Sequence, residues 1–169
     1  MCIFASPKII NMSSTKFDEL DRKILKLLIN NARKPYLEIA RECNVSGASI
    51  HQRIQKLTSL GLIEGFETQI NPAALGYDTC AYVGFVLSDP LRTEEVVAAL
   101  RNVPEIVEVH YTTGKYDLLA KLYAENNTHL LKVIRDRIFV LNAGRTETLI
   151  SFKEEFSRQV PIDQMSVDK

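Results

Sequence analysis

The sequence predicts an α+β protein in which a helical first part is followed by a part that alternates strands and helices. Apolar residues recur at helical spacing up to about residue 60, and from residue 79 onward short runs of strand formers alternate with helical stretches. The 169 residues suffice for one medium domain or two small ones, and the change of period favours two. The expected segments are a flexible tail (1–15), a helical domain (16–70), a linker (71–78), a mixed domain (79–162) and a second tail (163–169).

The composition is that of an ordinary globular protein, with 46% hydrophobic and 25% charged residues. No apolar run approaches the roughly 18 residues of a membrane-spanning helix, so we expect no membrane partner. The first twelve residues lack an apolar core long enough for a signal peptide, and Met12 is a candidate alternative translation start. The three cysteines (Cys2, Cys43 and Cys80) lie far apart, which predicts a cytoplasmic protein without a disulfide framework.

The formal net charge of zero arises from two halves of opposite sign. Residues 1–76 carry ten Lys and Arg against seven Asp and Glu, a net charge of +3. Residues 77–169 carry eleven against fourteen, a net charge of −3. A basic first half indicates that only this half meets a polyanion. Because this charge difference is small, the pattern of side chains has to show whether the first half binds a polyanion.

Residues 17–33 are the first predicted helix. Leu20, Ile24, Leu27 and Leu28 fall at i, i+4, i+7 and i+8 and so form a single apolar stripe. Acidic residues crowd the start of this segment, where the helix dipole favours negative charge.

A second, short helix is expected to begin at Pro35, which is favourable at the first helical position. Its expected apolar contacts are Leu37, Ile39 and Ala40. A tight turn at residues 44–46 then interrupts the helical pattern.

The third predicted helix, residues 46–60, begins at a serine that is a good N-cap and ends at Gly61, a plausible C-cap. Ile50, Ile54 and Leu57 make its inward stripe at i, i+4 and i+7. Its opposite face is polar.

Two short helices, a turn and a third helix with polar groups near its N-terminus are the plan of a helix-turn-helix motif. Small residues in the first turn would let the helix backbone approach a major groove, Gln52 and Arg53 can read base edges, and Lys56 suits phosphate. The alternative is a solvated helix face, but the three-helix context favours DNA binding. The predicted DNA-binding residues are Ser46, Gly47, Ala48, Ser49, His51, Gln52, Arg53 and Lys56.

Residues 62–70 alternate in a way that fits a strand or a small hairpin, ended by Asn71-Pro72. Behind a helix-turn-helix such a segment is a wing, so residues 16–70 are predicted to be a winged helix-turn-helix DNA-binding domain. Glu64 and Glu67 would be repelled by phosphates, and we therefore expect this wing to bind DNA weakly at best.

The second part has the order strand-helix-strand twice, which is the ferredoxin-like (βαββαβ) plan of a four-stranded antiparallel sheet with two helices on one side. In the last helix Leu130, Leu131, Ile134 and Ile138 are expected to face inward. The predicted strands are 79–87, 106–113, 117–124 and 146–156, and the predicted helices are 93–102 and 127–141.

The sheet face that the two helices leave uncovered has to find a partner. Large residues on the predicted strands include Tyr82, Phe85, Tyr111 and Phe152, and periodicity leaves open which of them face outward. A dimer built sheet to sheet is the expected solution.

This order of motifs resembles the Lrp/AsnC family, the feast/famine transcription regulators of bacteria and archaea. The resemblance runs from about Leu20 to Ile162. The matching pieces are LDRKIL (20–25), the third helix with Ser46, Ile50, Arg53 and Leu57, LGLI (60–63), INPAALG (70–76) and TGKYD (113–117).

The resemblance implies dimers that assemble further, often to octamers as tetramers of dimers, and that bind pseudo-palindromic promoter DNA. It also implies that the second domain, called RAM in this family, binds a free amino acid at the loop between its second and third strands. The implied effector-binding residues are Thr113, Gly114, Tyr116 and Asp117, together with Thr146 and Thr148 on the last strand.

The residue types in this loop suit an amino acid. Gly114 leaves backbone N–H groups open for a carboxylate, Asp117 can pair an ammonium group, and Tyr116 supplies a flat apolar wall. Taken without the family, the same segment is an ordinary β-turn. Lys115 would either favour an acidic effector or lie in solvent.

An enzyme is not expected. The three histidines (His51, His110 and His129) are scattered and pair with no cysteine at ligand spacing, and no nucleotide-binding glycine motif occurs. We therefore predict no catalytic residues, no metal and no cofactor. The alternative to a DNA-binding regulator is an amino-acid-binding oligomeric sensor with little or no DNA binding, and the sequence leaves the amino acid and the operator open.

Overall fold

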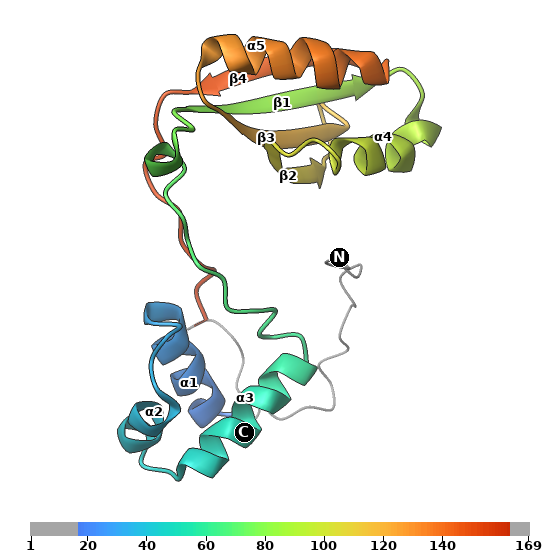
Figure 1. Cartoon of the computed structure of the whole chain (residues 1–169). Helices are drawn as coiled ribbons and strands as arrows, with labels where there is room; N and C mark the ends of the chain where they lie inside the picture. Colours follow the sequence, from blue (N-terminus) through green and yellow to red (C-terminus); the bar gives the residue numbers. More distant parts are fainter. Residues whose placement is uncertain (1–16, 163–169) are drawn as a thin grey trace. The chain divides into compact units, whose positions relative to one another are not determined.

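Three helices fill the first part of the computed structural model, which describes residues 17–162 (Figure 1). They are α1 (Glu19–Asn30), α2 (Tyr36–Cys43) and α3 (Gly47–Ser59). Helix α1 begins in a capping box, in which the backbone N–H of Asp21 donates to Oδ1 of Asp18 at 2.8 Å. Helix α3 begins at the predicted N-cap, because the Ser46 hydroxyl accepts the backbone N–H of Ser49 at 3.1 Å.

The apolar stripes of the three helices meet in one buried cluster. Ile50, Ile54 and Leu57 of α3 are buried, as predicted. The expectation for Leu37 is wrong, since this side chain is 67% exposed while Ile39 is buried. Two positions along an α-helix turn the chain by about 200°, so a residue two places before an inward one points away from the core.

The predicted wing is not a strand. Residues 62–70 form no regular secondary structure, and the four-stranded sheet of the described residues does not include them. The expected linker, residues 71–78, contains one short turn of 3₁₀ helix, η2 (Ala73–Leu75), which ends at Gly76 with φ of 87°.

The second part forms the predicted ferredoxin-like arrangement. Its four antiparallel strands lie in the order β2-β3-β1-β4, and α4 and α5 pack on the same face of the sheet (Figure 1). The elements in chain order are β1 (Thr79–Leu87), η3 (Pro90–Arg92), α4 (Thr93–Leu100), β2 (Ile106–Tyr111), β3 (Leu118–Ala124), α5 (Asn127–Val133), η4 (Ile134–Ile138), η5 (Phe139–Leu141) and β4 (Gly144–Ser151).

Two sequence expectations are wrong in this part, one about the burial of Leu131 and one about the end of the last strand. Leu131 is 62% exposed, because the buried stripe of Leu130, Ile134 and Ile138 repeats every four residues and leaves its neighbour turned to solvent. Strand β4 ends at Ser151, so Phe152 lies outside the sheet and is fully exposed.

The register of β1 decides which large residues face the helices. Phe85 is buried beneath the helices with Ala81, Val83 and Leu87, whereas Tyr82 lies on the open face opposite Lys121 of β3. Tyr111, at the end of an outer strand, is 73% exposed.

The chain divides into two compact units, one formed up to Thr68 and again from Arg158, and the other formed by Gln69–Ser157. The boundary differs from the predicted one, because residues 158–162 join the helical unit, where Ile162 packs against its apolar cluster. Both predicted tails lie outside the described residues. Among the helices of residues 17–162, none is long and apolar enough to cross a membrane.

Candidate functional site

The outward face of α3 is a stripe of polar side chains. Ser49, Gln52, Arg53 and Lys56 follow each other at i, i+3, i+4 and i+7, and together with Asp18 they line a shallow hollow. Gln52 is exposed, and so are His51 and Gln55 beside the stripe. Gln55 is a candidate that the sequence analysis did not select.

The first turn of α3 begins with two small residues, Gly47 and Ala48. Ala48 is exposed, which leaves the backbone accessible there. Gly47 is half-buried, and a Cβ atom at this position would lie 3.1 Å from Cδ2 of Leu37. The glycine therefore also permits the close approach of α2 to α3.

Arg53, which is predicted to read base edges, is held by two carboxylates within the chain. Its Nη1 donates to Oδ2 and Oδ1 of Asp18 at 2.7 and 2.8 Å and to Oδ1 of Asp21 at 2.8 Å. Lys56 Nζ donates to the other oxygen of Asp21 at 2.9 Å. The side chains of Arg53 and Lys56 are 27% and 35% exposed.

These four side chains tie α3 to the start of α1. Asp21 is completely buried, so its two ion pairs supply the partners that a buried carboxylate requires. Partial burial by itself would raise the pKa of Asp18, but hydrogen bonds from the Asp21 backbone and from Arg53 outweigh it and lower that pKa. At the guanidinium, hydrogen bonds to the carboxylates of Asp18 and Asp21 outweigh burial and raise the pKa of Arg53.

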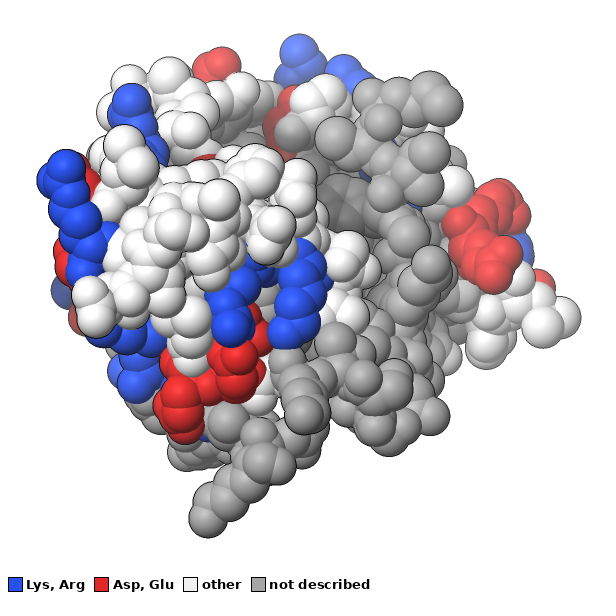
Figure 2. All heavy atoms as spheres, turned by 90° about the horizontal axis from the view of Figure 1, so that it is seen from below, with Lys and Arg blue, Asp and Glu red and all other residues white. Residues whose placement is uncertain are grey.

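The sequence analysis missed both aspartates as members of this face. It assigned the acidic residues at the start of the first helix to the helix dipole alone. The pairs join residues 32 and 35 positions apart, which no local pattern shows. In the space-filling view from below, basic and acidic side chains accordingly lie side by side (Figure 2).

The second candidate site is the loop between β2 and β3. Thr113 and Gly114 are exposed, and Gly114 has φ of 106°, which favours glycine. The loop is closed by the Thr112 hydroxyl, which donates to the Tyr116 carbonyl at 2.7 Å. The carboxylate of Asp117 is partly engaged, because its Oδ2 accepts the backbone N–H of Leu87 at 2.8 Å.

Tyr116 lies against the open face of the sheet. A Cβ atom at Gly84 of β1 would come within 2.5 Å of its ring, so only glycine admits the ring at this place. Lys115 pairs with Glu147 of β4 at 2.5 Å and lies 5.0 Å from the centre of the Tyr116 ring. The hydrogen bond between these two charged groups raises the pKa of Lys115 and lowers that of Glu147.

Both parts of the chain match known families. Residues 17–58 match the AsnC-type helix-turn-helix domain, and residues 80–161 match the Lrp/AsnC ligand binding domain. The regulatory protein AsnC of Haemophilus influenzae is 36% identical over 144 residues, which are 85% of this chain and 96% of that protein. The chain belongs to the Lrp/AsnC family.

Solved structures of Lrp/AsnC proteins have the same fold. The structure of Escherichia coli AsnC has a TM-score of 0.81 and 33% sequence identity, and the match covers 86% of this chain and 99% of that chain. A transcriptional regulator of Neisseria meningitidis, solved as a complex with L-Met, has a TM-score of 0.79 at 19% identity, over 87% of this chain and 97% of that one. At that identity the second likeness shows the fold alone.

Within the Lrp/AsnC ligand-binding domain, the structure does not bring all predicted effector residues together. The register of β1 and β4 pairs Thr146 with Phe85 and Thr148 with Val83, which places both threonines on the helix side of the sheet. Tyr116 lies on the other side. Within one chain Thr146 and Thr148 therefore lie apart from the loop, and their part in the effector site stays a prediction.

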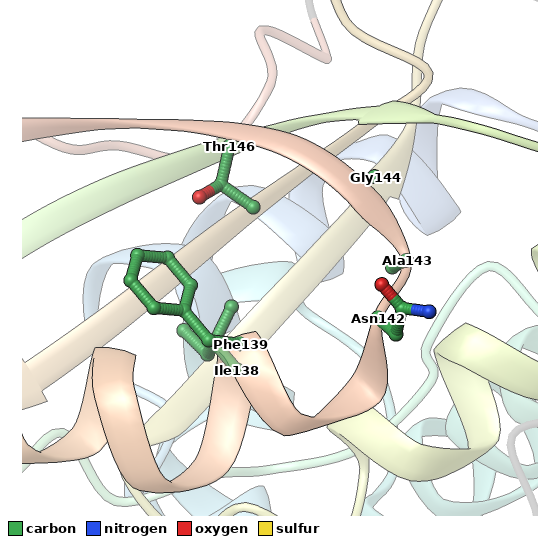
Figure 3. A pocket seen from close by; sticks show the side chains of 6 residues that line it. All are labelled: Ile138, Phe139, Asn142, Ala143, Gly144 and Thr146. Carbon is green, nitrogen blue, oxygen red and sulfur yellow. The ribbon is translucent and has the colours of Figure 1, made fainter.

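Thr146 instead contributes to a separate pocket of about 290 Å³ at the end of the last helix. In Figure 3 its hydroxyl and the Phe139 ring lie at one end of this pocket, and Asn142 lies at the other. The pocket is lined by Ile138, Phe139, Asn142, Ala143, Gly144 and Thr146. Across residues 17–162, no group of three or more His, Cys, Asp or Glu side chains could hold a metal ion.

Proposed function

We propose that this protein is a cytoplasmic transcriptional regulator that binds specific promoter DNA through α3 and changes its assembly or its DNA affinity when it binds a free amino acid. One observation carries the proposal. A helix-turn-helix with a polar outward face and a ligand-binding domain occur in the same chain of the Lrp/AsnC family. Neither DNA binding nor effector binding requires a catalytic group, a metal or another cofactor.

The proposed DNA contact uses the exposed side chains at the start and middle of α3. The Gln52 amide carries a donor and an acceptor and suits bidentate pairing with adenine in the major groove. His51 lies beside it and offers a further hydrogen-bonding group. The exposed methyl group of Ala48 leaves room for the base edges to approach the helix.

The proposed effector site is the loop formed by Thr113, Gly114, Tyr116 and Asp117. Backbone N–H groups around Gly114 suit a carboxylate, and the Tyr116 ring supplies an apolar wall. Asp117 binds protein through Oδ2, and its other carboxylate oxygen is the one we assign to an ammonium group. An amino acid is also the ligand of the Neisseria meningitidis neighbour, which was solved with L-Met.

A second copy of this chain is the proposed partner for the open face of the sheet. That face carries Tyr82, Leu119, Tyr123 and Leu149, which are half-buried or exposed in the single chain. A dimer would place two α3 helices in successive major grooves, with half-sites about 10 base pairs or a multiple apart. Further assembly of dimers, up to a tetramer of dimers, would bring effector loops of neighbouring dimers together.

Effector binding is then coupled to DNA binding through assembly. Such coupling typically amounts to about 1–3 kcal/mol and must be reciprocal, so DNA shifts effector affinity by the same factor. An amino acid that binds every assembly equally well would change neither assembly nor DNA affinity.

The second candidate function is an oligomeric amino-acid sensor with little or no DNA binding. The observation that favours it is the pairing of Arg53 and Lys56 with acidic residues, which lowers the charge available for phosphates. Selection of DNA from a pool of randomised duplexes separates the two functions. Enrichment of one sequence by the wild type but not by Gln52→Ala supports the regulator, with exposed Gln69→Ala as the matched control. No enrichment by the wild type supports the sensor.

Sedimentation of the pure full-length chain, titrated with an amino-acid pool and then with single amino acids, tests the effector. We expect one amino acid to shift the balance between assemblies, and Tyr116→Ala to abolish the shift. Tyr77→Ala, at an exposed position of the linker, is the control. A stable dimer that no amino acid changes contradicts the effector, and a monomer contradicts the proposed assembly.

A further inference from the structure

Arg53 is held from one side only. All three of its hydrogen bonds, to Asp18 and Asp21, leave from the single nitrogen Nη1. Within residues 17–162, Nε and Nη2 have no hydrogen-bond partner. One edge of the planar guanidinium, with two parallel N–H donors, therefore remains available while the rest of the group is fixed.

This available edge lies on the polar face of α3. Arg53 lines the same hollow as Ser49 and Gln52, and its side chain is 27% exposed. The group is thus neither buried as a purely structural ion pair nor extended into solvent. It is an accessible fork held on a helix face that offers other hydrogen-bonding side chains.

The charges around Arg53 favour directional hydrogen bonding to a base over general attraction to phosphates. Two carboxylates, of Asp18 and Asp21, balance the two cations of Arg53 and Lys56. Attraction to phosphates depends on the number of uncompensated cations, and this group of four contributes none in net charge. Directional hydrogen bonding to a base depends instead on a fixed orientation, which two carboxylates on one nitrogen provide.

We propose that Asp18 and Asp21 are positioning residues that orient Arg53, so that its Nε and Nη2 donate two hydrogen bonds to O6 and N7 of one guanine in the operator. The inference rests on the proposed DNA-binding function and specifies one base that the protein would read. Bidentate pairing of arginine with guanine is the contact for which this fork geometry is suited.

Asp21 is the main member of the pair. It is completely buried, its two oxygens bind Arg53 and Lys56 separately, and its backbone N–H is held by Asp18 in the capping box. The carboxylate therefore has a defined position in the folded helix pair. Asp18 is more accessible, with a side chain that is 42% exposed.

The test is a selection from randomised duplexes by the full-length wild type, followed by affinity measurements on the selected duplex and on its three substitutions at each guanine. The variants are Asp18→Asn, Asp21→Asn and Arg53→Gln. Asparagine is as good an N-cap as aspartate, so Asp18→Asn should leave α1 intact. If Asp21→Asn does not fold, Asp18→Asn alone tests whether the carboxylates orient Arg53. The control is Glu95→Gln, which alters the Arg92–Glu95 pair of α4 in the same chemical way.

We expect Arg53→Gln to reduce the preference for guanine at one position by roughly tenfold or more. We expect Asp18→Asn and Asp21→Asn to reduce it at that same position, while preferences elsewhere in the site stay close to those of Glu95→Gln. Because both variants weaken ion pairs of the helical unit, affinities are measured at a temperature at which each variant is folded. A purely structural role of the aspartates would lower affinity for every duplex equally, and that result overturns the inference.

Two other results also overturn it and differ from each other. If Arg53 contacts phosphate, Arg53→Gln reduces the slope of log affinity against log salt concentration by about 1 and changes no base preference. If the base preferences of the Asp18, Asp21 and Arg53 variants all equal those of the wild type, Arg53 reads no base although the protein binds DNA. If the wild type enriches no duplex at all, the proposed DNA-binding function itself fails.

Discussion

Replacing Gly84 by alanine tests how closely the Tyr116 ring is seated on β1. The added Cβ atom would lie 2.5 Å from Cδ1 and 2.6 Å from Cε1 and Cγ of that ring. Ordinary carbon contacts are at about 3.5–4.0 Å, so the ring has to move by roughly 1 Å or leave the sheet. The effect reports directly on the proposed effector loop.

Two opposing terms set the magnitude. Overfilling a packed site costs about 1–3 kcal/mol. Replacing glycine by alanine in a strand returns about 0.5–1 kcal/mol, because the unfolded chain loses conformational freedom. We therefore expect Gly84→Ala to lower the free energy of unfolding of the second unit by about 1–2 kcal/mol. In a Tyr116→Ala background the ring is absent, and the same change should cost less than about 0.5 kcal/mol or stabilise the fold.

Urea unfolding followed by far-UV circular dichroism measures this difference. With a slope of about 2 kcal/mol per molar urea, within the usual range of about 1–3, the expected cost lowers the midpoint by roughly 0.5–1 M. Gly65→Ala is the matched control, because no atom lies within 4 Å of a Cβ placed there. Our reasoning is refuted if Gly84→Ala is harmless in the wild type, or if it costs as much without the Tyr116 ring as with it.

In the helical unit, Leu57→Ala removes a completely buried side chain and should lower the free energy of unfolding by about 2–5 kcal/mol, measured by urea unfolding; a loss below 1 kcal/mol would contradict the described core. Ser46→Ala removes the acceptor for the Ser49 backbone N–H and should cost about 1 kcal/mol in thermal unfolding, whereas Ser46→Asp should cost little. The pKa of Asp18 is lower in the folded than in the unfolded chain, so its contribution to stability is complete above about pH 4 and is lost as the pH falls further. Thermal unfolding between pH 7 and pH 3 should show a smaller decline for Asp18→Asn than for the wild type, and equal declines would contradict this assignment.

The order of helices and strands could be predicted because their signals are local. The stripe of Ile50, Ile54 and Leu57 repeats at the helical period, and the serine before it supplies a hydroxyl for the first unpaired N–H groups. The prediction of a wing was wrong because a strand depends on a partner that is not local in the sequence. Alternation along residues 62–70 indicates a strand, but a strand also needs a hydrogen-bonding neighbour, which the sequence pattern does not show.

The loop between β2 and β3 was predicted from family resemblance, and the sequence indicated only some of the contacts that its residues make. Glycine, tyrosine and aspartate were assigned to an amino acid, yet the Asp117 carboxylate also binds the backbone of β1. That β1 needs glycine at position 84 to admit Tyr116 could not be predicted, because the two residues lie on different strands of the sheet.

The sequence by itself determined the order of the helices and of the four sheet strands, most of the inward apolar positions and the ferredoxin-like plan, because each depends on neighbours within a few residues. Only the tertiary structure decided that Arg53 is held by α1 and that Thr146 lies on the opposite side of the sheet from Tyr116. The period of two along a strand tells which residues share a face, but the packing of every strand against the helices decides which face is buried. Likewise, an ion pair between side chains more than 30 residues apart forms only when two helices are docked against each other.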